Sequence, residues 1–340
     1  MRPTLLKETI KAHFRSARQR AMDIRGQPGL GKTTVVVDTA EEDLDVPCIV
    51  NHTGTMLVED FGVPDIIGRD LSRKDFGHLV PSWYPYEGKE GTENGGIILF
   101  DDRGQASSDN QKVIANILQA KTLHGVPLAK RWMCISTSNN ASDRAGANRV
   151  LSHLADRENT YQYEVHLDDW TSWAIAHGVH KMVVGFIRMR PGALHDFDPQ
   201  RDKNATPRGW AEGVSDSIGV VPAEAEYETY CGAVGEGRAA EFAGYCKIYR
   251  TLPDPMSILL NPDKAKLPED VATLYALAGV LSEVVTENNF GRMTQYFDRL
   301  PEDKQDISVL AASYAVRNKP EIGHTAEFTD WAVKHSSILF

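Results

Sequence analysis

The sequence predicts an α/β fold in which helices pack against a parallel sheet, followed by a second region made of helices. Three observations predict it. A glycine-rich loop lies between a strand candidate and a helix candidate near residue 26, two later apolar strands end in polar residues, and strand-like segments stop after residue 167. A chain of 340 residues is long enough for about two domains, which we place at 1–167 and 168–340.

The overall composition is that of a globular protein. Hydrophobic residues make up 41% of the chain and charged residues 25%, which excludes an intrinsically disordered, collagen-like or coiled-coil protein. Lys and Arg number 37 against 47 Asp and Glu, a formal net charge of −10. Because nucleic-acid-binding proteins normally carry a basic surface, this balance argues against a nucleic-acid partner, although it leaves room for a local basic stripe.

Nothing in the sequence predicts a membrane span or secretion. No apolar stretch approaches the roughly 20 residues that cross a bilayer, and the N-terminal segment is too charged for a signal peptide. The cysteines are far apart and lack metal-binding spacing, which indicates reduced thiols. We therefore expect a cytoplasmic protein with no membrane partner. The four cysteines are Cys48, Cys134, Cys231 and Cys246.

Hydrophobic spacing predicts the elements of the first region. Residues 1–20 are predicted to form an amphipathic helix whose apolar residues are Leu5, Leu6, Ile10 and Phe14. In the first strand candidate, Asp23 and Arg25 alternate with apolar residues, so we expect these charges to pair or to lie near an edge of the sheet. The strand candidates are 21–25, 46–51, 97–101, 131–136 and 161–167.

The most specific motif directly follows the first strand candidate. Residues 26–33 match G-x-x-x-x-G-K-[ST], the pattern of a phosphate-binding loop. Glycines let successive N–H groups point at a phosphate, the lysine brings positive charge to the β- and γ-phosphates, and the threonine hydroxyl binds Mg²⁺. We expect a helix to begin at about Lys32, despite the β-branched run that follows. The residues expected to bind the nucleotide are Gly26, Gln27, Pro28, Gly29, Leu30, Gly31, Lys32, Thr33 and Thr34.

Two later strands end in residues that could complete this site. The apolar segment 97–100 runs into Asp101 and Asp102, as expected for a Walker B strand buried on both faces. Asp101 would bind Mg²⁺ together with Thr33, and Asp102 would polarise the attacking water. The next strand ends in a polar run containing Asn139, whose amide could orient that water or contact the γ-phosphate. Read alone, either segment is also compatible with an ordinary turn after a strand.

In this order, the motifs resemble those of AAA+ ATPases, and in particular the MoxR-like branch found in bacteria and phages. The resemblance spans roughly residues 5–340. It implies a three-layer core with one parallel five-stranded sheet, followed by a helical lid and further C-terminal helices. Besides the two Walker motifs, the segments that carry it are 58–64, 81–85, 138–140, 143–146, 154–157 and 206–210.

The resemblance also implies cofactors, partners and further site residues. It implies an ATPase that binds ATP or ADP with Mg²⁺ and forms a hexamer-type homo-oligomeric ring, which remodels or helps to assemble a protein partner. A von Willebrand-type protein is one such partner. Arg157 would act as a finger on the nucleotide of the neighbouring subunit, with Arg144 and Arg149 as rivals, and Arg208 would couple the lid to the nucleotide.

One departure from the family pattern concerns the rate of hydrolysis. The family usually has Glu after the metal-binding Asp, whereas this chain has Asp102, which is one methylene shorter. A misplacement of about an ångström can reduce a rate on the order of 100-fold, so we expect slow hydrolysis unless the backbone compensates. The alternative functions are therefore a nucleotide-dependent switch or structural ring component with little turnover, and a chelatase-type AAA+ subunit.

The second region is predicted to be helical. Asp168 or Asp169 is the expected N-cap of its first helix. Thr206 and Pro207 indicate the start of another helix, which places Arg208 in a first turn, where the helix dipole disfavours a cation. We expect an anion to offset this charge, and the resemblance supplies the γ-phosphate.

Overall fold

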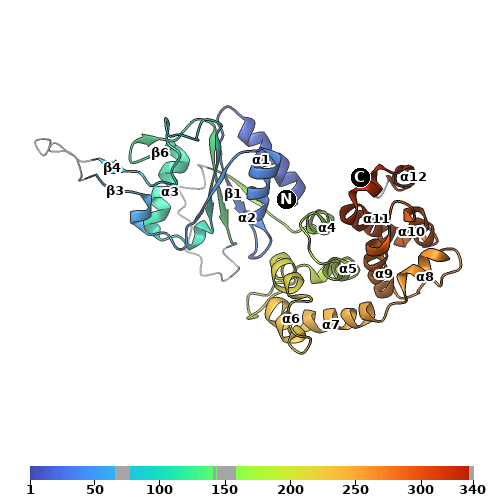
Figure 1. Cartoon of the computed structure of the whole chain (residues 1–340). Coiled ribbons are helices and arrows are strands. Elements are labelled where there is room, and N and C mark those ends of the chain that lie inside the picture. The colour runs from blue at the N-terminus through green and yellow to red at the C-terminus, as the bar shows by residue number, and fades with distance from the viewer. Residues whose placement is uncertain (66–76, 141–142, 144–157, 337–340) are drawn as a thin grey trace, which may run out of the picture. The chain divides into compact units, whose positions relative to one another are not determined.

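The computed structural model describes residues 1–65, 77–140, 143 and 158–336. The chain divides into two compact units, Met1–His166 and Leu167–Phe340. Figure 1 shows strands and helices in the first unit and a helical second unit.

The first unit is built on a five-stranded sheet whose neighbours all pair in parallel. The strand order is β2-β5-β8-β1-β9. The strand β8 therefore lies between the strand that precedes the glycine-rich loop and the strand that ends in the acid pair. The bounds are β1 Ala21–Arg25, β2 Cys48–His52, β5 Gly96–Asp101, β8 Trp132–Ser138 and β9 Glu158–Gln162.

The sheet is covered on both faces, because alternate residues of its central strands enter two different hydrophobic clusters. Ile97 and Leu99 pack with α1 (Pro3–Arg15) and α2 (Lys32–Asp38). Ile98 and Phe100 pack with α3 (Ser108–Ala120) on the other face. All six residues of β5 are buried, as the uninterrupted apolar run predicts. This gives the predicted three-layer α/β core, visible in Figure 1.

The predicted elements of the first unit need several corrections. The helix predicted over 1–20 ends at Arg15, because Ser16 is already extended. The strand predicted at 161–167 is β9, which begins at the buried Glu158 and ends at Gln162. The sequence does not indicate that the strand begins at Glu158, because a carboxylate is an unusual first residue for a buried strand. The other four strands lie within two residues of their predicted bounds.

Two short hairpins complete the first unit. The first pairs β3 (Val63–Pro64) with β4 (His78–Leu79), and the second pairs β6 (Thr122–Leu123) with β7 (Val126–Pro127). The loop between β7 and β8 returns the chain to the end of the sheet at which β1 also begins.

The second unit consists of packed helices. The apolar helix α9 lies at its centre and packs against α5, α7 and α11. The predicted N-cap at Asp168 or Asp169 is wrong: α4 begins at Leu167, so both aspartates lie in its first turn, where the helix dipole favours them. No helix within the described ranges is both long and apolar enough to traverse a bilayer. The α-helices are α4 Leu167–Ala176, α5 Lys181–Met189, α6 Glu226–Val234, α7 Glu236–Arg250, α8 Pro255–Leu260, α9 Val271–Val284, α10 Phe290–Phe297, α11 Asp306–Asn318 and α12 Ala326–Lys334.

Candidate nucleotide-binding site

The glycine-rich loop joins the carboxyl end of β1 to the start of α2. Its backbone is left-handed at Gly29 (φ 74°) and Gly31 (φ 87°), a conformation that glycine adopts without steric penalty. A side chain at Gly26 would bring a Cβ within 2.8 Å of the Tyr163 carbonyl oxygen. The helix begins at Lys32 as predicted, and no side chain caps it. The N–H groups of this turn are therefore available to a phosphate.

Lys32 lies between the loop and the tip of β8. Its Nζ donates hydrogen bonds to the carbonyl oxygens of Gly26 and Gln27, each at 2.9 Å, and to Asn139 Oδ1, also at 2.9 Å. The residue is only 7% exposed. The ammonium group is thus held against the concave side of the loop, where a bound phosphate would meet it.

Thr33 and Asp101 meet at the carboxyl end of β5. Thr33 Oγ1 donates to Asp101 Oδ1 at 2.6 Å, and Thr137 Oγ1 donates to the same oxygen at 2.6 Å. The other carboxylate oxygen, Oδ2, lies 3.2 Å from His52 Nδ1. A hydroxyl and a carboxylate oxygen at this separation fit Mg²⁺, whose neighbouring oxygen ligands lie about 3 Å apart in an octahedral shell.

Asp102 has a left-handed backbone, with φ 50° and ψ 44°. Its N–H donates to Thr137 Oγ1 at 3.0 Å, and its Oδ1 accepts a hydrogen bond from Asn139 Nδ2 at 3.2 Å. Aspartate tolerates this conformation better than most residues other than glycine. The turn directs the chain away from the strand immediately after Asp101, so the two consecutive carboxylates acquire different partners.

The sequence did not reveal a buried charge network beneath this site. The Arg103 side chain is fully buried, and its Nη1 donates to Glu158 Oε2 at 2.5 Å and to Ser136 Oγ at 3.3 Å. Its Nη2 lies 3.2 Å from Asp23 Oδ2. Burial lowers the pKa of Arg103, but the carboxylates of Asp23 and Glu158 outweigh it and raise that pKa. The guanidinium therefore stays charged and links β1 to β9.

Asp23 and Arg25 do form a pair, as the alternation in β1 suggested, with Arg25 Nε donating to Asp23 Oδ2 at 2.5 Å. However, β1 is an internal strand between β8 and β9, so an edge position is excluded. Asp23 is fully buried because Arg103 and Ser138 also contact its carboxylate. The charge alternation was the one sequence signal of the network. Its central member, Arg103, could not be recognised from its position alone.

The remaining predicted residues lie outside the described part of the first unit. Arg144, Arg149 and Arg157 lie outside the described residues. Arg208 belongs to the second unit, in the first turn of a helix that Thr206 caps by accepting a hydrogen bond from Gly209 N at 3.1 Å. The nearest carboxylate recorded for Arg208 is that of Glu212, at 3.9 Å from Nε.

The chain matches no family model and no curated protein. Among solved structures it is similar to NtrX from Brucella abortus, with 15% identity and a TM-score of 0.35 over 96% of this chain and 64% of that one. It thus spans less than two thirds of that NtrX chain. A DNA polymerase III gamma subunit-related protein from Thermotoga maritima gives 12% identity and a TM-score of 0.37 over 91% of both chains. A RuvB mutant from Thermotoga maritima gives 13% identity and a TM-score of 0.37 over 81% of this chain and 82% of that one.

The topology of the chain itself establishes the fold class. A phosphate-loop motif follows β1, an acid pair ends β5, and the polar-tipped β8 lies between these strands in a parallel five-stranded sheet. A helical region follows. This is the α/β P-loop fold of the AAA+ type, as the sequence predicted.

Proposed function

We propose that the chain binds ATP with Mg²⁺ and hydrolyses it as an AAA+ ATPase. The observation that carries this proposal is the convergence of Lys32, Thr33, Asp101, Asp102 and Asn139 at the carboxyl ends of three adjacent strands. Each side chain is held by a hydrogen bond to another member of the set. Such pre-positioned charges suit phosphoryl transfer, in which catalysis depends mainly on positioning and electrostatic stabilisation.

The loop and its lysine bind the phosphates in this proposal. The N–H groups of residues 29–33 would surround the β-phosphate, and Lys32 would exchange its carbonyl partners for β- and γ-phosphate oxygens. Thr33 and Asp101 hold Mg²⁺, which would neutralise charge on the phosphates as the terminal bond breaks. The hydrogen bond from Thr137 fixes the Asp101 carboxylate in the orientation that this role needs.

Asp102 and Asn139 act on the attacking water. Asp102 accepts the proton of the water, and the Asn139 amide, which contacts both Asp102 and Lys32, fixes the distance between the base and the phosphate-binding lysine. Asp102 is one methylene shorter than the glutamate that is usual at this position of the family. We propose a slow ATPase for this reason, because aspartate reaches less far than glutamate.

The oligomeric state and the partner extend the same proposal. As a MoxR-like AAA+ protein, the chain would form a hexamer-type ring, in which Arg157 reaches the nucleotide of the next subunit and Arg208 couples the helical unit to the phosphate. The ring would remodel or assemble a protein partner, and a von Willebrand-type protein is the candidate. This extension rests on the sequence motifs and not on the contacts of the first unit.

Steady-state phosphate release from ATP tests the proposed activity. Turnover should require Mg²⁺ and should be lost in Lys32→Ala, while Lys112→Ala, on the exposed side of α3, should match the wild type. Turnover that is unchanged by Lys32→Ala would refute the proposal.

A nucleotide-dependent switch is the second candidate. The short acid at position 102 and its hydrogen bond to Asn139 favour it, because both keep the carboxylate close to its strand. A switch should bind ATP tightly with negligible turnover, even in the presence of its partner. A remodelling ATPase should hydrolyse ATP at a rate that its partner changes.

A further inference from the structure

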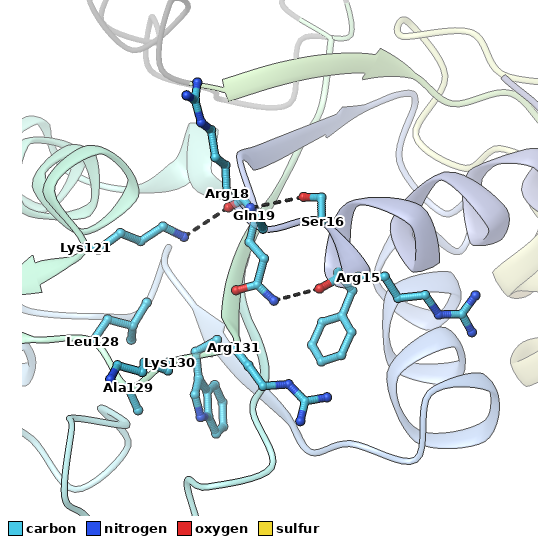
Figure 2. A pocket seen from close by; sticks show the side chains of 12 residues that line it. Arg15, Ser16, Arg18, Gln19, Lys121, Leu128, Ala129, Lys130 and Arg131 are labelled. Atoms are coloured by element: carbon cyan, nitrogen blue, oxygen red, sulfur yellow. Dashed lines mark hydrogen bonds between the residues drawn. The ribbon is translucent and has the colours of Figure 1, made fainter.

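A second polar cavity lies in the first unit, away from the phosphate loop. It has a volume of about 610 Å³ and is lined by residues 14–19, Lys121 and residues 128–132 (Figure 2). These segments adjoin the starts of β1 and β8, whereas the phosphate loop follows the carboxyl end of β1. A five-residue strand is about 17 Å long, so the two sites lie at opposite ends of β1.

The cavity is strongly basic in an acidic protein. Five of its lining residues are cationic and none is acidic: Arg15, Arg18, Lys121, Lys130 and Arg131. Lys130 lies 3.4 Å from Glu87, but no carboxylate in the described part of the chain forms an ion pair with Arg15, Arg18 or Arg131. With a net charge of −10, carboxylates are abundant elsewhere on this chain. Arg15, Arg18 and Arg131 thus line this cavity without an ion-pair partner among the described residues, and a bound anion would compensate part of their charge.

Several residues that line this cavity have an unusual backbone conformation. Three of its lining residues, Gln19, Lys121 and Arg131, are non-glycine residues with positive φ, at 41°, 53° and 65°. Such residues cluster at ligand-binding sites more often than elsewhere. Lys121 is the C-cap of α3, Gln19 lies two residues before β1, and Arg131 directly precedes β8.

Gln19 ties the loop before β1 to both of its sides. Its side chain Nε2 donates to the Phe14 carbonyl oxygen at 2.8 Å, and its backbone N–H donates to Ser16 Oγ at 3.1 Å. Lys121 Nζ donates to the Gln19 carbonyl oxygen at 3.3 Å. Figure 2 marks these three hydrogen bonds with dashed lines. The loop is therefore ordered by its own contacts before any ligand binds, which lowers the ordering entropy lost on binding.

We propose that this cavity binds a ligand that carries several phosphate groups. Three of its cations are arginines, whose planar guanidinium groups bind phosphate oxygens in pairs. Charge density decides between phosphate and carboxylate ligands. A phosphodiester or polyphosphate chain carries a negative charge on every phosphate of its own backbone, whereas an acidic peptide would have to place five separate carboxylate side chains, together with its peptide backbone, in about 610 Å³ to match these five cations.

Two sources can supply this chemistry: the phosphodiester chain of a single-stranded nucleic acid, and a free polyphosphate. The nucleic acid and the polyphosphate both carry successive phosphates a few ångströms apart. Such a ligand can therefore contact cations that come from three separate segments of the chain. The buried Phe14, Leu128 and Trp132 provide an apolar floor between the cations. The proposal does not depend on the proposed ATPase activity, because it uses none of the residues at the phosphate loop.

Binding measurements on the full chain test this proposal. All variants carry Lys32→Ala, so that the phosphate loop contributes little. The probes are tripolyphosphate, followed by calorimetry, and a fluorescein-labelled oligothymidylate, followed by anisotropy. We expect Arg18→Glu and Arg131→Glu each to weaken binding at least tenfold. The matched charge reversal Lys112→Glu, on an exposed helical lysine, should change it less than twofold.

The salt dependence gives a second readout for the oligothymidylate. Each lost phosphate contact should reduce the slope of log affinity against log salt by about 0.7. Binding of the oligothymidylate supports the proposal and identifies nucleic acid as the source, and binding of tripolyphosphate alone supports it with a free polyphosphate as the source. The proposal is overturned if neither probe binds below 1 mM, if Lys112→Glu is as damaging as the cavity variants, or if a polyglutamate peptide binds more tightly than both probes.

Discussion

Asn139 accepts a hydrogen bond from Lys32, with 2.9 Å between Oδ1 and Nζ. The opposite end of the same amide donates to Asp102. Because the donor and the acceptor of an amide are fixed relative to each other, one side chain sets the spacing between the phosphate-loop lysine and the second acid. The position of the lysine is therefore coupled to that of the acid through Asn139.

Replacing Lys32 with alanine should weaken ATP binding roughly 100-fold or more, because hydrogen bonds to charged groups contribute about 1.5–3 kcal/mol each. Calorimetric titration with ATP and Mg²⁺ measures the loss. The unfolding transition should stay cooperative, which separates a lost contact from a lost fold. Unaltered ATP affinity in a folded variant would contradict the role of Lys32.

Asp102→Asn should stop hydrolysis while ATP remains bound. The change removes the proton acceptor, an effect on the order of 100-fold or more, and spares Thr33 and Asp101. Single-turnover phosphate release, combined with a nucleotide-binding titration, measures the two effects separately. A rate within twofold of the wild type would show that Asp102 is not the base.

Asp102→Glu tests the departure from the family pattern. We expect a faster enzyme, because glutamate reaches further than aspartate toward the attacking water. A slower enzyme in the same phosphate-release experiment would instead show that the site is built around the shorter acid.

Arg157→Ala and Lys32→Ala should each be inactive alone, and mixed subunits should regain partial ATPase activity. In a ring, an intact loop in one subunit then meets an intact finger in the next, and such an arginine can contribute 10³- to 10⁵-fold in rate. Mixing before assembly, followed by ATPase measurement, checks this. If the mixtures assemble and stay inactive, Arg149 or Arg144 becomes the candidate.

Arg103→Met should destabilise the chain by about 3–5 kcal/mol, because it leaves the buried carboxylates of Asp23 and Glu158 without their cation. Urea unfolding measures the free energy. Arg18→Met, which removes an exposed arginine, should stay within about 0.5 kcal/mol of the wild type. An equally small effect at position 103 would show that the network contributes no stability.

His180 should make the second unit less stable as the pH falls. Burial, with a smaller contribution from Lys181, lowers the pKa of His180 to about 4, and its Nδ1 caps α5 by accepting a hydrogen bond from Met182 N at 3.2 Å. The unfolded chain binds the proton at about pH 6.5 and the folded chain only near pH 4, so stability is lost as the pH falls between these values.

We expect this loss to be on the order of 1 kcal/mol between pH 7 and pH 5, after allowing for solvent screening at the partly exposed imidazole. The variant His180→Asn keeps an N-cap that does not titrate. Urea unfolding at both pH values should therefore show a smaller loss for this variant. Equal losses for the two proteins would exclude His180 as the cause.

The sequence was sufficient for the parts of the core in which pattern and motif agree. The buried strand β5 was predicted because its four apolar residues run into two acids. The start of a helix at Lys32 was predicted because the phosphate-loop motif outweighs the β-branched run that follows it. Hydrophobic periodicity could not predict the start of β9, because this strand begins with Glu158. The burial of Glu158 depends on its contact with Arg103, which lies 55 residues earlier in the sequence. Contacts of that range leave no local signal.

The same limit applies to the sites. Lys32, Thr33 and Asp101 belong to motifs whose spacing reflects direct chemical needs, and their neighbours could be anticipated. The basic cavity draws its cations from the end of α1, the end of α3 and the loop before β8. These segments are far apart in the sequence and meet only because the sheet brings them together. The acidic overall composition therefore gave no indication of a basic cavity.

The left-handed backbone at Asp102 constrains how this position can evolve. Glutamate is a single-nucleotide change away from aspartate, yet a longer side chain at a positive φ meets a steric penalty that aspartate, asparagine and glycine largely avoid. A saturation library at codon 102, selected only for folded protein, should therefore be enriched in these three residues. Glutamate should be recovered at this position less often than these three residues, so the backbone conformation of the turn favours the shorter acid during evolution.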